Sequence, residues 1–69
     1  MPIAFMNTGE VRTVLRIAGE PKVRRHLENL GFVEGTPVRV VTVLAGDLIV
    51  QVKDARVAIS RELAMKIFV

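Results

Sequence analysis

The second half of the chain restricts the fold most strongly, because it reads as a series of short strands joined by tight turns. Residues 38–44 are dense in β-branched side chains, and residues 48–53 place Leu or Val at every second position. Such runs are typical of strands with one buried face. Residues 45–47 predict a hairpin connection, and residues 54–55 predict a tight turn. A further alternating strand is expected from residue 57 onward.

The first half of the chain predicts one more strand, over residues 10–19. Its alternation places four residues on the expected core-facing side: Val11, Thr13, Leu15 and Ile17. Their neighbours on the other side are Arg12, Val14, Arg16 and Ala18. Val14 interrupts that polar side, which is compatible with a β-bulge. Upstream of this strand, Phe5 and Met6 are expected to pack together as an apolar plug against the domain.

One helix is predicted between this strand and the later ones. Gly19 ends the strand, and Pro21 stands where the first helical residue would be, a position that tolerates its missing N–H. Val23, Leu27 and Leu30 follow at spacings of four and three, which makes one narrow apolar stripe. We expect this stripe to contact the sheet.

The stretch HLENLGFVEG, residues 26–35, predicts how the helix ends and the next strand begins. Gly31 falls at the helix C-terminus, where a residue with left-handed backbone geometry is often required. Phe32 is expected to fold back on the last turn of the helix. Gly35 then begins the turn into the strand. These residues are interpreted as determinants of the fold rather than as a loop that binds a ligand.

Taken together, these segments predict a single domain over residues 1–69. The chain has no cysteine, so its small core must be stable without disulfides. Ser60 is expected to cap a short helical turn, and residues 67–69 a terminal strand. The predicted fold is mainly β: a small, partly open barrel of about five strands, with one α-helix after the first strand and a short helical turn before the last.

Basic side chains are the most conspicuous polar feature, although the net charge is only +3. Five of them are expected on the helix and the adjoining strand: Arg12, Arg16, Lys22, Arg24 and Arg25. They could form a solvated face, meet an acidic patch on a protein partner, or bind nucleic acid. RNA-binding barrels generally use aromatic stacking platforms. Because the chain has three Phe and no Tyr or Trp, no nucleic-acid partner is expected.

The sequence contains no recognisable catalytic or metal-binding motif. It has one histidine and no cysteine, and its carboxylates are almost all isolated from one another. Ferrous iron prefers histidine and carboxylate ligands, but His26 has only Glu28 nearby, at a spacing that does not place both on one helix face. We therefore expect no catalytic residue, no metal ligand, no cofactor and no enzyme activity. No apolar run approaches the ~20 residues of a membrane helix, so a cytoplasmic protein without membrane insertion is expected.

The stretch HLENLGFVEG at the end of the helix, the Gly46-Asp47 hairpin and the alanine-containing turn before the terminal strand resemble the FeoA family of ferrous-iron transport accessory proteins. The leading Phe5 and Gly9 match the start of the family pattern. The helix-end motif matches at five positions: Leu27, Leu30, Gly31, Phe32 and Gly35. Gly46 and Asp47 match the family's hairpin, and the ending matches at Ile59, Arg61, Ala64, Ile67 and Val69. The chain departs from the pattern at Leu48, where the family usually has proline, and at residues 54–55, where it often has glycine.

The resemblance implies an SH3-like barrel and a small cytoplasmic bacterial protein of iron homeostasis, linked to transition metal ions. It also implies docking on the cytosolic GTP-binding part of the FeoB ferrous-iron transporter. On that basis we hypothesise that Arg24, Arg25 and a partly exposed Leu27 contact the partner. A wholly buried Leu27 remains the alternative for that residue. Two other functions stay open: an RNA-binding small barrel, and an adaptor that self-associates through exposed strand edges and its apolar termini.

Overall fold

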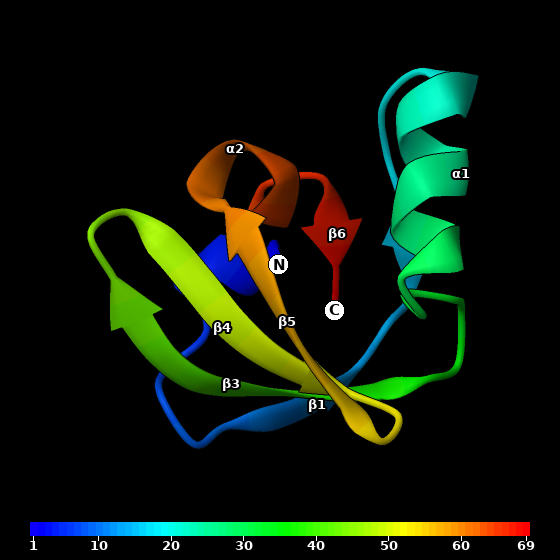
Figure 1. The fold of residues 1–69 in the computed structure, drawn as a ribbon. Coiled ribbons are helices and arrows are strands. Elements are labelled where there is room, and N and C mark those ends of the chain that lie inside the picture. The colour runs from blue at the N-terminus through cyan, green and yellow to red at the C-terminus, as the bar shows by residue number, and fades with distance from the viewer.

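The computed structural model describes all 69 residues and shows a mainly β fold with one longer helix (Figure 1). The N-terminal elements are a 3₁₀ turn η1 (Ile3–Phe5), strands β1 (Val11–Thr13) and β2 (Arg16–Ile17), and helix α1 (Pro21–Asn29). The C-terminal elements are β3 (Pro37–Leu44), β4 (Asp47–Val52), β5 (Ala55–Ser60), the short helix α2 (Arg61–Ala64) and β6 (Ile67–Phe68). Helix α1 stands at one end of the molecule, and the tip of the β3–β4 hairpin projects from the other.

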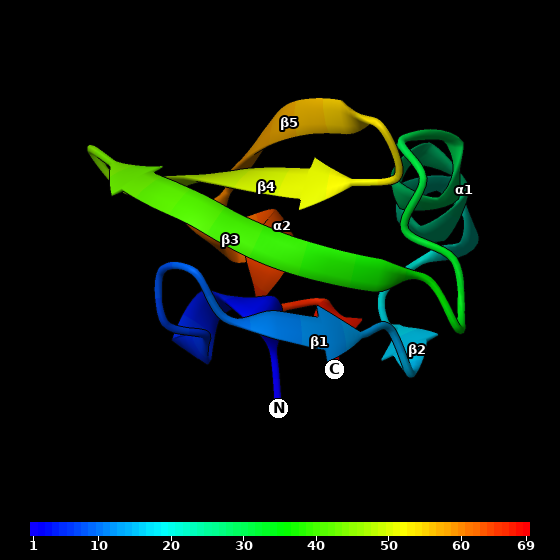
Figure 2. The same ribbon diagram turned by 90° about the horizontal axis from the view of Figure 1, so that it is seen from below.

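The strands form two antiparallel sheets that together make a partly open barrel (Figure 2). Four strands pair in the order β1-β3-β4-β5, and β2 pairs with β6 in the second sheet. The pairing of β3 with β4 shifts by one residue between Val40 and Thr42, which is a bulge in β3. This architecture confirms the predicted small barrel with a helical turn before its last strand.

Alternation along the central strands builds the core, as predicted. In β4, Leu48, Val50 and Val52 are buried, and in β3 Val38 and Val40 meet them from the neighbouring strand. Side chains on a strand point alternately to its two faces, so a single face of this sheet supplies most of the core. The rest of this core is covered by three short segments, namely α2, η1 and the end of α1.

The predicted strand over residues 10–19 is instead two strands in different sheets, and its buried face is wrong. Val14 is fully buried, whereas Leu15 is 60% exposed. The chain leaves β3 after Thr13 and reaches β6 at Leu15, whose N–H donates to the Phe68 carbonyl at 2.7 Å. The corner at Val14 is held by the turn before β3, because the Gly35 N–H donates to the Val14 carbonyl at 2.8 Å. Alternation fails here because the strand changes partner in mid-course.

The N-terminal plug forms with a different residue from the one predicted. Ile3 and Met6 are buried, but Phe5 is 54% exposed. The 3₁₀ turn places Ile3 and Met6 on its inner side, since the Met6 N–H donates to the Ile3 carbonyl at 2.9 Å. The Phe5 ring lies on the outer side beneath the Arg61 guanidinium, 5.9 Å from the ring centroid.

The two hairpin turns are each two residues long. Ala45 and Gly46 join β3 to β4 with φ of 47° and 88°, the positive values at both central positions that a type I′ turn requires. The second turn consists of Lys53 and Asp54, one residue earlier than the predicted turn at residues 54–55. The sequence offers no glycine there, and Lys53 adopts a φ of 54° in its place.

Candidate partner-binding groove between α1 and β2

Helix α1 begins and ends at the residues that the sequence indicates. Pro21 is its first residue, preceded by Glu20 in an extended conformation. At its end Gly31 has a φ of 112°, its N–H donates to the Glu28 carbonyl, and the Phe32 N–H donates to the Leu27 carbonyl. This pair of bonds is a Schellman motif, which satisfies carbonyls that the helix itself leaves free. Phe32 then lies fully buried, so the motif anchors the helix to the core.

The apolar stripe of α1 faces the barrel, which corrects the hypothesis that Leu27 is partly exposed. Leu27 is fully buried, while Val23 and Leu30 on either side of it are half-buried against the same core. A nine-residue helix has room for one narrow apolar stripe, and its central residue is the one most enclosed by the sheet. Leu27 is therefore a core residue and does not form part of an exposed docking surface.

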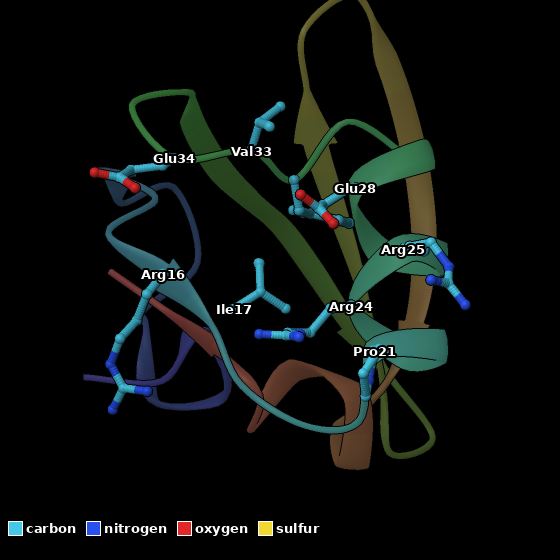
Figure 3. Close-up of a pocket in the computed structure, with 9 residues that line it drawn as sticks. Arg16, Ile17, Pro21, Arg24, Arg25, Glu28, Val33 and Glu34 are labelled. Carbon is cyan, nitrogen blue, oxygen red and sulfur yellow. The ribbon is translucent and has the colours of Figure 1, made fainter.

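Beside the contact between α1 and the barrel, the structure contains a groove of about 460 Å³ that is lined by α1, β2 and the segment after the helix (Figure 3). Nine residues line it: Arg16, Ile17, Pro21, Arg24, Arg25, Glu28, Phe32, Val33 and Glu34. Ile17, Phe32 and Val33 are its three hydrophobic residues, and its charged side chains come from α1, β2 and the segment after the helix.

Three of the five predicted basic residues line this groove: Arg16, Arg24 and Arg25. The Arg24 side chain extends from α1 into the groove toward Ile17, whereas Arg16 and Arg25 point outward from its borders (Figure 3). Arg16 also covers the Phe68 ring, with the guanidinium carbon 4.0 Å from the ring centroid. Lys22 and Arg12 do not line the groove.

None of the groove arginines is neutralised within the molecule. The single salt bridge of the structure joins Arg12 to Glu10, with the Nε–Oε2 distance at 2.6 Å. Glu28 follows Arg24 by four residues and also lines the groove, yet the two side chains form no ion pair. An arginine placed before a glutamate at this spacing is the less favourable orientation on a helix. The arginines thus remain available to an external anionic group.

The acidic and histidine side chains of the structure form no cluster of potential metal ligands. No group of three or more His, Cys, Asp or Glu residues lies close enough together to hold a metal ion, and His26 is an exposed residue of α1. Glu10, which lies outside the groove, has a lowered pKa. The Asn7 backbone N–H and then the Arg12 side chain donate hydrogen bonds to its carboxylate, which lowers its pKa below the ordinary 4.5.

The sequence singles out the three arginines that line the groove, Arg16, Arg24 and Arg25, but not the groove itself or its other lining residues. Arg24 and Arg25 were expected on an exposed face, and both line the groove. Ile17 was expected in the core and Val33 and Glu34 were not singled out, because their proximity depends on how the segment after Gly31 folds back toward β2. The motif residues Gly9, Gly31, Gly35 and Gly46 all have positive φ, which accounts for glycine at each of them. No helix of the structure is long and apolar enough to span a membrane.

The chain is similar in sequence and structure to known FeoA proteins. The family model for the FeoA domain matches residues 1–69. A crystal structure of an iron uptake regulatory protein, FeoA, has a TM-score of 0.90 at 28% identity, and the match covers 97% of this chain and 91% of that one. FeoA from Stenotrophomonas maltophilia, solved with zinc and described as an SH3 domain protein, has a TM-score of 0.87 at 26% identity, with coverages of 99% and 87%.

Two more solved structures resemble the chain over nearly its whole length. FeoA from Chlorobium tepidum has a TM-score of 0.90 at 27% identity, covering 99% of this chain and 67% of that one. A manganese-dependent transcriptional repressor shares the fold, with a TM-score of 0.88 at 24% identity, but this chain corresponds to only 39% of it. No curated protein sequence matches the chain. The family model spans every residue of an SH3-like barrel, so the chain belongs to the FeoA domain family of ferrous-iron transport accessory proteins.

Proposed function

We propose that this FeoA domain acts in the cytoplasm by docking on the cytosolic GTP-binding part of a FeoB-type ferrous-iron transporter, and that the groove beside α1 is its docking site. One observation carries the proposal: Arg16, Arg24 and Arg25 line a groove that also contains apolar residues, and none of the three has an ion-pair partner. Arginine is well suited to such a site, since its planar guanidinium pairs with carboxylates and its stem packs on apolar surface.

The partner surface that fits this groove is acidic with a small apolar contact. Arg24, which extends toward Ile17, would pair with a carboxylate of the partner, while Ile17 meets an apolar side chain. Glu28 and Glu34 on the groove border would repel a purely anionic polymer but accept a protein surface that also carries a basic residue. This mixed border favours a protein over nucleic acid.

Retention on the isolated cytosolic domain of the transporter tests the proposal. The chain should be retained in at least one guanine-nucleotide state, and Arg24→Glu should abolish retention. Lys22→Glu is the matched control, because it makes the same charge change on the same helix outside the groove. Absence of retention in every nucleotide state would refute the docking, and equal loss from both variants would show that the groove is not the site.

RNA binding is not supported by any arrangement of side chains in this structure. Of the three phenylalanines, Phe32 is buried, Phe68 is covered by Arg16, and only Phe5 is largely exposed. One exposed ring does not form the platform on which successive bases stack. The chain should therefore show no RNA affinity that falls steeply with rising salt.

A further inference from the structure

Strand β5 (Ala55–Ser60) is an open edge of the main sheet. It pairs with β4 on one side and with no strand on the other. Figure 2 shows that no other element lies beyond it. The opposite edge, β1, has only three residues, so β5 is the longer of the two free edges.

The pairing with β4 determines which backbone groups of β5 are free. A two-residue turn makes the flanking residues Val52 and Ala55 a hydrogen-bonded pair, and such pairs then alternate along an antiparallel ladder. Val57 and Ile59 therefore bond to β4, whereas the N–H and C=O groups of Arg56 and Ala58 point to the open edge. Neither residue takes part in any backbone hydrogen bond outside the ladders.

This edge lacks most of the features by which proteins protect exposed strands. Edges are usually blunted by bulges, prolines, several charges or a covering segment. β5 contains no proline and pairs with β4 in continuous register. Arg56 is its only charged residue. The bulge of this sheet lies in β3, away from the edge.

We propose that β5 pairs antiparallel with β5 of a second copy of this chain, with the two-fold axis at Val57. In this register Arg56 lies opposite Ala58 of the second copy, and Val57 lies opposite its equivalent. The only charged side chain of the paired segment thus faces a small neutral one, so no like charges oppose each other directly in this register. Two hydrogen-bonded pairs would exchange about four main-chain hydrogen bonds.

The same geometry limits the assembly to two copies. A two-fold interface uses the same surface on both chains and leaves no second copy of it free. The remaining edge β1 offers only three residues and belongs to a different sequence, so it cannot continue the pairing. The groove beside α1 is formed by α1, β2 and the segment after the helix, and it contains no residue of β5.

Sedimentation equilibrium of the full chain, with charge variants at the edge, tests this register. Ala58→Arg would place an arginine opposite Arg56 at both symmetric positions, and like charges directly opposite each other destabilise strand pairing. The dimer dissociation constant should rise on the order of tenfold. Because Ala58 is exposed, the melting temperature of the monomer should not change.

A charge exchange provides the decisive control. Arg56→Glu alone leaves a charge opposite alanine and should retain the dimer, and Arg56→Glu combined with Ala58→Arg should restore it. Thr13→Arg on the other edge, also an exposed position, should have no effect. Amide exchange gives an independent readout: the Arg56 and Ala58 amides should gain protection as concentration rises, while those of Val57 and Ile59 are protected throughout.

Four outcomes would overturn the proposal. The wild-type chain could remain monomeric at every concentration, or Ala58→Arg could leave its dimer unchanged, or the charge exchange could fail to restore it. If the Arg56 and Ala58 amides gain protection only when another protein is added, the edge serves that protein and not a second copy.

Discussion

At the scale of single residues, Leu27 distinguishes a stabilising role from a binding role. Its side chain is fully buried at the centre of the stripe by which α1 contacts the core. We expect Leu27→Ala to lower the free energy of unfolding by about 2–5 kcal/mol, because the mutation leaves a cavity. Urea denaturation measures this loss, with Asn29→Ala at an exposed position of the same helix as the control. A loss of partner binding at unchanged stability would contradict the burial of Leu27.

A second prediction at the residue scale concerns the pKa of Glu10. Its pKa lies below the ordinary 4.5 because the Asn7 N–H and the Arg12 side chain bond to the ionised carboxylate. A lowered folded-state pKa stabilises the fold above the unfolded-state value, and this stability is lost as pH falls through the folded-state value. Arg12→Ala should therefore raise the pKa of Glu10 part of the way toward 4.5, since the larger contribution from Asn7 remains.

An NMR titration of the Glu10 side chain measures that shift. The acid unfolding of the Arg12→Ala variant should also become less dependent on Glu10 below pH 4.5. Lys22→Ala is the comparison, because its side chain forms no ion pair with any carboxylate. An unchanged pKa in Arg12→Ala would show that the salt bridge contributes nothing in solution.

At the scale of elements, some strands were predictable and others were not, for a physical reason. β4 and β5 keep the same neighbours along their length, so alternation correctly indicated the inward-facing residues of both. β3 was recognisable as a strand from its β-branched residues. Residues 10–19 change partner from β3 to β6 at Val14, and the reversal of faces there depends on tertiary contacts. The turn residues Gly31 and Gly46 were recognisable because their backbone geometry requires glycine or strongly favours it.

At the corner between β1 and β2, the structure predicts that Val14 contributes more to stability than Leu15, whereas the alternation of the sequence predicts the reverse. Val14→Ala should destabilise the fold by about 2 kcal/mol, because Val14 is fully buried. Leu15→Ala removes a larger apolar side chain but should change stability by no more than about 0.5 kcal/mol, since Leu15 is mostly exposed. Thermal unfolding of the two variants measures both effects. The reverse order would support one continuous strand with Leu15 in the core.

At the scale of the whole molecule, the barrel and the turns that follow α1 hold together the three segments that line the groove. The Schellman motif at Gly31 and the turn at Gly35 direct residues 32–34 back past β2, and this closes the groove on its third side. From the sequence, the groove was foreseeable only as a basic helix face. Its hydrophobic residues Ile17, Phe32 and Val33 lie on two separate segments, and no local pattern indicates that these segments line one groove.

The most direct test of groove docking is calorimetric titration of the FeoB cytosolic domain with the wild-type chain, Arg24→Glu and Lys22→Glu, in parallel with and without guanine nucleotide. We predict saturable binding of the wild-type chain and of Lys22→Glu, and a loss of affinity on the order of tenfold or more for Arg24→Glu, because that variant opposes a carboxylate to an acidic partner surface. All three chains should unfold at the same temperature. Binding that Arg24→Glu leaves intact, or no binding by the wild-type chain in any nucleotide state, would contradict docking through this groove.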